Sequence, residues 1–280
     1  MQVTFYGVRG SIATSGPEFS EFGGNTTCLT IEHEGHRLIV DAGTGIRALG
    51  DRALAESRAL ARPVHVNLLF THLHWDHIQG FPFFTPAFVP STTLSLYGPM
   101  SEGATLEHAL AAQMRPPHFP VPLSAMGATK NFFTLGGDEQ LEIGPFAIRT
   151  AELTHPQGVI GYRFEAGGRS ICFATDTEHR DDGSFDAQLL GIAAGADVLI
   201  YDAQYTPAEY EGRSGPSRKG WGHSTFEVAA RLARAAGAKK LVLFHHDPTH
   251  DDGLVRAIES EARGLFPWAT AARERLPIAA

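Results

Sequence analysis

Four apolar, strand-like segments of this chain are each followed, at once or after one threonine, by a side chain that can bind a metal ion. His72 follows VNLLF, His155 follows FAIRTAEL, Asp176 follows SICFAT and His245 follows KLVLF. In α/β proteins, binding sites form in the crevice beyond the carboxyl ends of the strands. This placement therefore predicts an α/β fold in which the four side chains meet along one edge of the sheets.

The first of these segments runs into a dense group of metal-competent side chains. The stretch THLHWDHIQG (71–80) holds His72, His74, Asp76 and His77. Imidazole and carboxylate groups this close together are typical of metal sites. With the strand-end residues, they provide enough ligands for two divalent ions.

The ligand types divide naturally between two ions. One ion is expected to bind three imidazoles, from His72, His74 and His155. The other is expected to bind a carboxylate and two imidazoles, from Asp76, His77 and His245, with Asp176 bridging both ions. About three protein ligands per ion leave room for water, which is the mark of a catalytic site, and paired ions suit phosphoryl transfer. Zinc is the first candidate metal, and manganese and iron are the others.

Both halves of the chain carry hairpins followed by helices. Alternating apolar and polar residues predict hairpins over 27–43 and 159–175. Helical spacing predicts helices over 44–57, 101–114, 186–193, 224–237 and, as a closing element, 253–266. No linker is visible, so we expect residues 1–280 to form a single domain. The expected fold class is α/β, a four-layer αβ/βα sandwich of two mixed sheets flanked by helices.

The composition limits the possible partners of the protein and the cell compartment in which it is expected. With 31 acidic and 23 basic residues the net charge is −8, which argues against broad binding to nucleic acid or to an anionic membrane. The start of the chain does not resemble a signal peptide, and no apolar run is long enough to span a membrane. Cys28 and Cys172 lie in apolar segments and are expected to be core thiols rather than a disulfide. We therefore expect a cytoplasmic protein with no membrane partner.

The segment HLHWDH (72–77) resembles the His-x-His-x-Asp-His signature of the metallo-β-lactamase superfamily, whose fold is an αβ/βα sandwich. Lactamases, lactonases, thioester hydrolases, nucleases and di-iron proteins share that signature. A second segment, 222–252, is similar to the C-terminal part of the tRNA 3′-processing (ribonuclease Z-like) endonucleases and their phosphodiesterase relatives. In these enzymes a His-Ser-Thr triplet opens a helix, and the next strand ends in the last metal histidine. On this alignment His223 matches the triplet histidine, and His245, rather than His246, matches the final ligand.

The resemblance also implies roles for individual residues. Asp76 resembles the catalytic aspartate that orients the attacking hydroxide, and His223 resembles a catalytic histidine that contacts the scissile phosphate and protonates the leaving oxygen. Ser224 is a candidate N-cap of the helix that follows. Asp41 and Asp202, each at a strand end, are expected either to hydrogen-bond ligand histidines or to cap loops. Relatives often form dimers, so a homodimer is one candidate assembly.

The leading expectation for function is a dinuclear metal-dependent phosphodiesterase acting on a small substrate, with a cyclic nucleotide as the first candidate. The His-Ser-Thr triplet and the negative charge favour it. So do aromatic residues near the ligands that could stack on a base: Trp75, Phe81, Phe83, Phe84, Tyr205, Tyr210 and Trp221. Of these, Phe83 and Phe84 are better assigned to core packing. Trp75 stands where the tRNA-processing enzymes tend to have a small residue, so it is a candidate for selecting substrate size.

Two alternatives remain open. A tRNA 3′-end endonuclease would use the same chemistry, but binding of nucleic acid is not favoured, because only 101–130 and 205–222 are sizeable candidate arms. The second of these contains a modest basic cluster of Arg213, Arg218 and Lys219. A non-hydrolytic di-iron redox or sensor protein could share the ligands, although that chemistry would leave His223 without a function. A lactamase or lactonase fits the triplet poorly.

Overall fold

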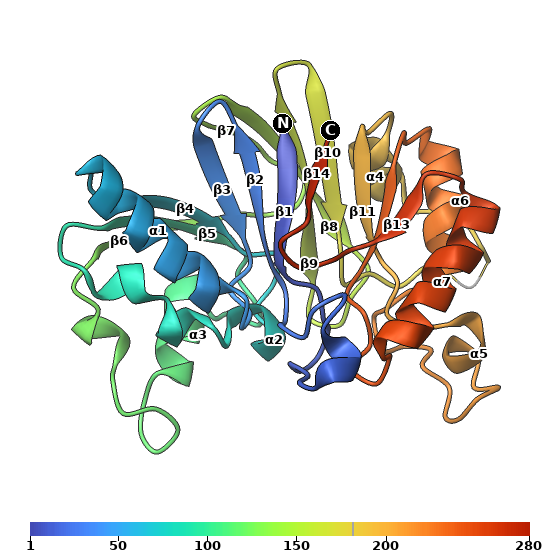
Figure 1. Cartoon of the computed structure of the whole chain (residues 1–280), viewed down its shortest axis with the longest axis horizontal. Helices are drawn as coiled ribbons and strands as arrows, with labels where there is room; N and C mark the ends of the chain where they lie inside the picture. The colour runs from blue at the N-terminus through green and yellow to red at the C-terminus, as the bar shows by residue number, and fades with distance from the viewer. Residues whose placement is uncertain (181) are drawn as a thin grey trace.

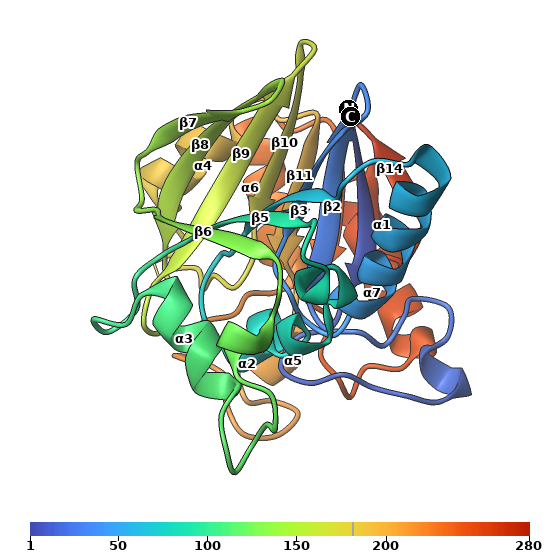
Figure 2. The same ribbon diagram turned by 90° about the vertical axis from the view of Figure 1, so that its left-hand side faces the viewer.

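Two seven-stranded mixed sheets lie face to face, with helices on both outer faces (Figures 1 and 2). The structure is a computed structural model that describes residues 1–180 and 182–280. The expected α/β, four-layer αβ/βα sandwich is confirmed. Apolar side chains of both sheets fill the space between them, among them Phe5, Val40, Phe164 and Phe244.

The first sheet has the strand order β14-β1-β2-β3-β4-β5-β6. Its pairs are antiparallel from β14 to β3 and parallel from β3 to β6. Its strands are β1 (Gln2–Gly7), β2 (Cys28–His33), β3 (His36–Val40), β4 (His65–Leu69), β5 (Thr93–Gly98), β6 (Thr129–Thr134) and β14 (Pro277–Ala279).

The second sheet has the strand order β13-β12-β11-β10-β9-β8-β7. Its pairs are antiparallel from β7 to β10 and parallel from β10 to β13. Its strands are β7 (Gln140–Ile143), β8 (Phe146–Leu153), β9 (Val159–Ala166), β10 (Arg169–Ala174), β11 (Val198–Asp202), β12 (Leu241–Phe244) and β13 (Ala269–Ala271).

The helices cover the outer faces because each presents an apolar stripe to a sheet. The first sheet is covered by α1 (Ile46–Leu60) and α3 (Leu106–Gln113), and the second by α4 (Ala187–Ala193), α6 (Phe226–Ala236) and α7 (Asp252–Leu265). The remaining helices are short: α2 (Trp75–Ile78), α5 (Pro207–Tyr210) and 3-10 turns at Pro17–Phe19, Phe81–Phe83, Thr85–Phe88 and Leu123–Ala125.

Element boundaries differ from the sequence predictions where local turn chemistry intervenes. The helix predicted over 101–114 begins only after Thr105, whose side chain accepts a hydrogen bond from the His108 amide. Thr225, rather than Ser224, is the N-cap of α6. Helix α7 does not close the chain, because β13 and β14 follow it and β14 pairs with β1. These strands have three residues each, too few to show a period of two.

Two further expectations concern burial and membrane contact. Cys28 and Cys172 are buried free thiols, as predicted. Across the part of the chain that the structure describes, no helix is long and apolar enough to cross a membrane.

Candidate metal centre

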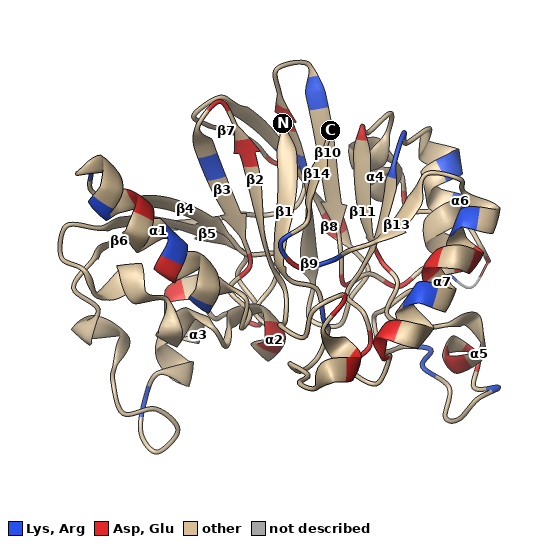
Figure 3. Ribbon diagram, viewed as in Figure 1, with Lys and Arg blue, Asp and Glu red and all other residues tan. Residues whose placement is uncertain are grey.

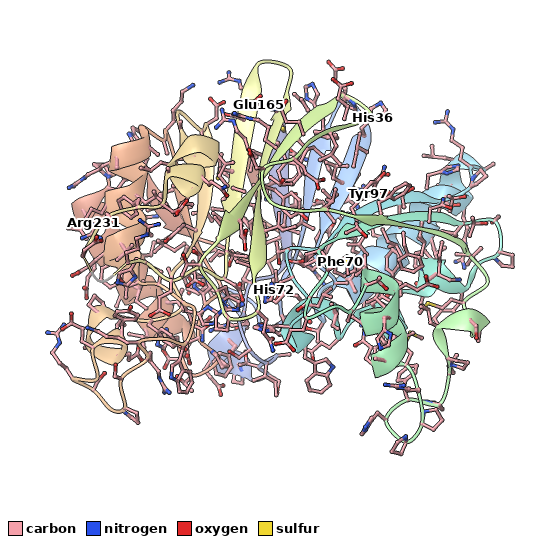
Figure 4. The ribbon with its side chains drawn as sticks, turned by 180° about the vertical axis from the view of Figure 1, so that it is seen from behind. His36, Phe70, His72, Tyr97, Glu165 and Arg231 are labelled. Carbon is pink, nitrogen blue, oxygen red and sulfur yellow. The ribbon has the colours of Figure 1, made fainter. Side chains whose placement is uncertain are left out.

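The strand-end residues meet at one edge of the sandwich. His72 follows β4, His155 follows β8, Asp176 follows β10 and His245 follows β12, and all four lie where the loops of the two sheets come together. In Figure 4 the labelled His72 lies at this edge, below the strands and between the two halves of the molecule. The two sheets thus bring these four residues to a common position, as their placement just after strand-like segments predicts.

Three histidines form the first group. His72, His74 and His155 each present a ring nitrogen, and these nitrogens lie within 4.8 Å of one another. The closest pair is His155 Nε2 and His74 Nδ1, at 3.1 Å. His72 is buried, whereas the other two are partly exposed.

The second group contains Asp76, His77, Asp176 and His245, all of which are buried. Asp76 and His77 come from the single turn of α2, directly after His74. His77 Nε2 lies 3.3 Å from His245 Nε2, and His245 Nε2 lies 3.2 Å from Asp76 Oδ2. The ligand atoms of this group, like those of the first, therefore converge on one small volume.

Asp176 connects the two groups. Its Oδ2 atom lies 3.2 Å from His77 Nε2 on one side and 3.5 Å from His72 Nε2 on the other. The residue adopts a left-handed backbone conformation, with φ of 54°, directly after β10. This conformation is uncommon for a residue with a side chain, and it turns the carboxylate toward both groups of histidines.

The contacts between these residues fit bound cations. The Nε2 atom of His72 is buried and has no hydrogen-bond partner among the described residues. Neutral imidazole nitrogens that point at one another and at carboxylates satisfy themselves by binding a metal ion. The residues present therefore fit two divalent ions, one in each group, with Asp176 between them.

The electrostatics of the centre favour the metal-binding forms of His72, His155 and Asp176, and the protonated form of His77. Burial opposes protonation of His77, but the charges of Asp176, Asp76 and Asp41 outweigh it and raise its pKa well above the usual range, so an ion binding there would displace a proton. Burial and the nearby charge of His77 hold the pKa of His72 well below its usual range. Burial also lowers the pKa of His155 to about 4. Burial opposes ionisation of Asp176, but the charges of His245 and His77 outweigh it and hold its pKa well below the usual range. Neutral imidazoles and ionised carboxylates are the forms that bind metals.

In most of these histidines, the ring nitrogen that points away from the other proposed ligands makes a hydrogen bond that orients the ring. His77 Nδ1 donates to Asp41 Oδ2 at 2.9 Å, and His245 Nδ1 donates to Gln204 Oε1 at 2.8 Å. His155 Nδ1 donates to the carbonyl oxygen of Gly222 at 2.8 Å, and His74 Nε2 donates to Gln157 Oε1 at 2.9 Å. Such bonds set the tautomer and the orientation of a ligand ring.

Sequence reasoning did not find three of these orienting groups. The side chains of Gln204 and Gln157 carry no charge, and Gly222 acts through its backbone, so none has a motif of its own. The one available signal for Gln204 and Gly222 is proximity in the chain, because Gln204 follows Asp202 by two residues and Gly222 precedes His223.

His223 lies beside the second group and is held by Asp202. Its Nδ1 atom donates to Asp202 Oδ2 at 2.8 Å, and its ring is stacked on His245 with centroids 5.0 Å apart. Burial opposes its protonation, but Asp202 outweighs burial and raises the pKa of His223 to about 9. The hydrogen bond to Asp202 and the stacking on His245 thus place His223 at the rim of the centre.

His246 points away from the centre. Its Nε2 atom donates to the carbonyl oxygen of Ala272 at 3.2 Å, and its ring packs edge-on against Phe22. Of the two consecutive histidines, His245 is the one whose ring enters the second group.

The aromatic residues near the ligands separate into two kinds. Phe81 and Phe84 are buried in the core under α1, and Tyr205 and Tyr210 are also buried. Burial excludes Phe81 from the predicted role in stacking and confirms that Phe84 is a core residue. Phe83, which the sequence places in the core, is instead exposed, as are Trp75 and Trp221. Phe83 is the last residue of the 3-10 turn Phe81–Phe83, whereas Phe84 follows it in an extended conformation, so the two side chains point in different directions.

Basic residues are sparse along the same edge. In Figure 3 the blue segments near this edge lie mainly on the loop after α5 and the loop after α3, while α2 and α5 carry red segments. The loop after α5 contains Arg213, Arg218 and Lys219.

Comparisons with known proteins agree with this architecture. The profile of the beta-lactamase superfamily domain matches residues 36–246, well over half of the chain. Ribonuclease Z of Synechococcus sp. (strain CC9311) is 24% identical over 99% of this chain and 98% of its own length. The metallo-beta-lactamase fold protein YhfI of Bacillus subtilis superposes with a TM-score of 0.71 at 20% identity, covering 99% of this chain and 98% of that one. The short form of human tRNase Z superposes with a TM-score of 0.68 at 20% identity, covering 100% and 99% respectively.

The matched region includes every residue of the two groups, from His72 to His245. With its two facing sheets and its convergent histidines and aspartates, the chain belongs to the beta-lactamase superfamily and is a metal-dependent hydrolase with ribonuclease Z proteins among its relatives.

Proposed function

We propose that this chain acts as a single hydrolase domain, a dinuclear metal-dependent phosphodiesterase. The ions would be held by His72, His74 and His155 in one group and by Asp76, His77 and His245 in the other, with Asp176 shared. The observation that carries the proposal is the ion pair of His223 and Asp202 beside these groups. A protonated histidine at the rim of a metal centre suits the expulsion of an alkoxide from a phosphodiester.

The bound ions, Asp76 and His223 would each have a different role in the reaction. Divalent ions in these groups would supply Lewis-acid chemistry, polarising a phosphoryl oxygen and lowering the pKa of a nucleophilic water. Asp76 accepts a hydrogen bond from the Ser11 amide at 2.7 Å, so its carboxylate is fixed and can orient the attacking water. His223 would donate its Nε2 proton to the leaving oxygen while Asp202 holds the ring in place.

The first candidate substrate is a tRNA precursor cleaved on its 3′ side. This differs from the expectation drawn from charge alone, because relatives that match nearly the whole chain are ribonucleases Z. The second candidate is a small phosphodiester such as a cyclic nucleotide. The net charge of −8 and the few basic residues along the site edge favour it, since tight binding of RNA relies on many phosphate contacts.

The chemistry is tested with a dinucleoside monophosphate, a diester whose leaving group is an alkoxide that needs a proton, and protein loaded with zinc or manganese. His223→Ala should retain two ions per chain by elemental analysis but lose about 100-fold in turnover, because it removes the general acid. His118→Ala, which changes an exposed histidine outside the centre, is the matched control and should be unaffected. Full turnover by the His223 variant would refute the proposed role.

The substrate is tested by offering the same protein a tRNA precursor, cyclic mononucleotides and cyclic dinucleotides. Cleavage of the precursor, with affinity that falls steeply as salt rises, would support the first candidate. Selective turnover of a cyclic nucleotide, with weak binding of tRNA, would support the second.

A further inference from the structure

A cavity of about 300 Å³ adjoins the metal centre on the side of His223. Four segments distant in the sequence line it. They contribute Ser11, Gln204 with Tyr205, Arg218 with Trp221, and Asp247 to Thr249. Because His223 forms part of the same wall, a molecule in this cavity would have one end at the metal centre.

One wall combines an exposed aromatic ring with a cation. The guanidinium of Arg218 lies 4.5 Å from the centroid of the Trp221 ring and 5.8 Å from that of Tyr205. Trp221 is 53% exposed, an unusual state for so large an apolar side chain. The guanidinium makes no hydrogen bond or ion pair with any residue in the described ranges 1–180 and 182–280, so its donors are available to a ligand.

The backbone on both sides of Trp221 is fixed by one carboxylate. Glu178 accepts hydrogen bonds from the amides of Gly220, at 2.7 Å, and Gly222, at 2.8 Å. The Tyr210 hydroxyl donates to the same carboxylate at 2.7 Å. Gly222 in turn receives the hydrogen bond from His155. The Trp221 segment is therefore tied to a residue of the first metal group, and little ordering would be needed when a ligand binds.

The rest of the lining is mostly polar. Asp247 Oδ1 accepts hydrogen bonds from the amide and the hydroxyl of Thr249, both from the loop that follows His245. Ser11, Gln204 and Glu209 also line the cavity. Hydroxyl, amide and carboxylate groups in the same cavity as an aromatic face suit a ligand with a flat ring and a hydroxylated portion.

We propose that this cavity binds the nucleoside next to the scissile phosphate, with its base stacked on the pair formed by Trp221 and Arg218. The phosphate would then lie at His223 and the sugar would face the polar part of the lining. This assignment rests on the proposed phosphodiesterase function and deepens it. A nucleoside of either candidate substrate, RNA or a cyclic nucleotide, presents the same chemistry to this cavity.

The assignment is tested with two substrates that differ only in the nucleoside. Thymidine 5′-(p-nitrophenyl phosphate) carries a base and a sugar where methyl p-nitrophenyl phosphate carries a methyl group. Trp221→Ala should lower kcat/KM for the thymidine substrate about tenfold and leave the methyl substrate within about twofold, because stacking is lost. Trp221→Phe should recover most of that loss. Trp268→Ala, which removes another exposed tryptophan outside the cavity, is the matched control. If Trp221→Ala changes kcat/KM by the same factor for both substrates, the assignment is overturned.

A binding measurement separates this assignment from the proposed function. The chain has three tryptophans, so a protein carrying Trp75→Phe and Trp268→Phe reports on Trp221 alone. We expect AMP to quench its fluorescence with saturation, and ribose 5-phosphate at the same concentration to leave it unchanged. Quenching in a protein that hydrolyses no phosphodiester would refute the proposed function and keep the nucleoside site. Turnover of phosphodiesters without quenching by AMP would refute the nucleoside site alone.

Discussion

Two carboxylate–histidine pairs, one from each half of the molecule, hold similar positions and differ in what the histidine faces. Asp41 follows β3 in the first sheet and binds His77 at 2.9 Å, while Asp202 ends β11 in the second sheet and binds His223 at 2.8 Å. Both carboxylates are fully buried. Each also accepts backbone hydrogen bonds, Asp41 from Thr71 and Asp202 from Gln204 and Ser224.

The difference lies at the far side of each imidazole. His77 is completely buried, with Nε2 between Asp176 and His245. His223 is 9% exposed and lines the cavity beside the centre. Under the proposed function, one strand-end aspartate would orient a histidine for metal binding, and the other would orient a histidine toward the substrate. The surroundings of the second ring nitrogen, rather than the carboxylate, therefore separate the two proposed roles.

The largest contrast is expected from asparagine at each aspartate. Asp41→Asn should weaken metal binding about 10- to 100-fold, because it disturbs the bond that orients a ligand. Asp202→Asn should leave metal affinity within about threefold and lower turnover instead, because His223 loses the charge that keeps it protonated. Competition with a chelating dye measures the affinities. Equal loss of metal in both variants would remove the distinction between the pairs.

A second contrast is expected where the loop that contains Trp221 meets the first metal group. At Gly222 an added Cβ would lie 2.2 Å from His155 Nδ1, whereas at Gly220 nothing lies within 4 Å. Both glycines have positive φ, of 85° and 80°, so alanine strains the backbone equally at each. Gly222→Ala should cost about 3 kcal/mol and displace His155, and Gly220→Ala about 1 kcal/mol.

Urea unfolding and metal content distinguish these two variants. We expect loss of metal from the Gly222 variant alone. If the Gly220 variant loses as much metal, the contact between the loop and His155 is not what positions that ligand.

The smallest effect, a change in the free energy of unfolding, is expected at Glu259, whose carboxylate binds an arginine instead of a histidine. Burial opposes ionisation of Glu259, but hydrogen bonds from Arg273 and the Ala271 amide outweigh it and lower its pKa to about 2. Because the folded-state pKa lies below the unfolded one, the stabilisation is full above about pH 4.5 and is lost as pH falls toward about 2. Glu259→Gln should therefore cost about 2 kcal/mol at pH 7 and progressively less below about pH 4.5.

Denaturant titrations of wild type and variant across this pH range give the difference in the free energy of unfolding. Metal content and turnover at pH 7 should not change, since Glu259 lies in α7, away from both carboxylate–histidine pairs. A difference that is independent of pH would show that the charge of Glu259 is not what stabilises the fold.

Much of the architecture could be predicted from patterns within short segments. The hairpin at β2 and β3 and the amphipathic helices α1, α6 and α7 follow from apolar spacing, because local periodicity decides which face is buried. The seven proposed ligands could be named because imidazoles and carboxylates clustered directly after strands are typical of metal sites. Strands as short as β13 and β14 could not be predicted, since three residues carry no period.

Local sequence patterns and the family resemblance were therefore enough to predict the superfamily fold, the proposed metal ligands, the strand ends that carry them and the choice of His245 over His246. They did not show that Gln204 and Gly222 accept hydrogen bonds from His245 and His155, or that Trp221 and Arg218 form a wall beside His223. These features depend on contacts between segments far apart in the chain. The periodicity of a segment shows which side chains are buried, whereas the groups they meet there depend on how the two sheets pack.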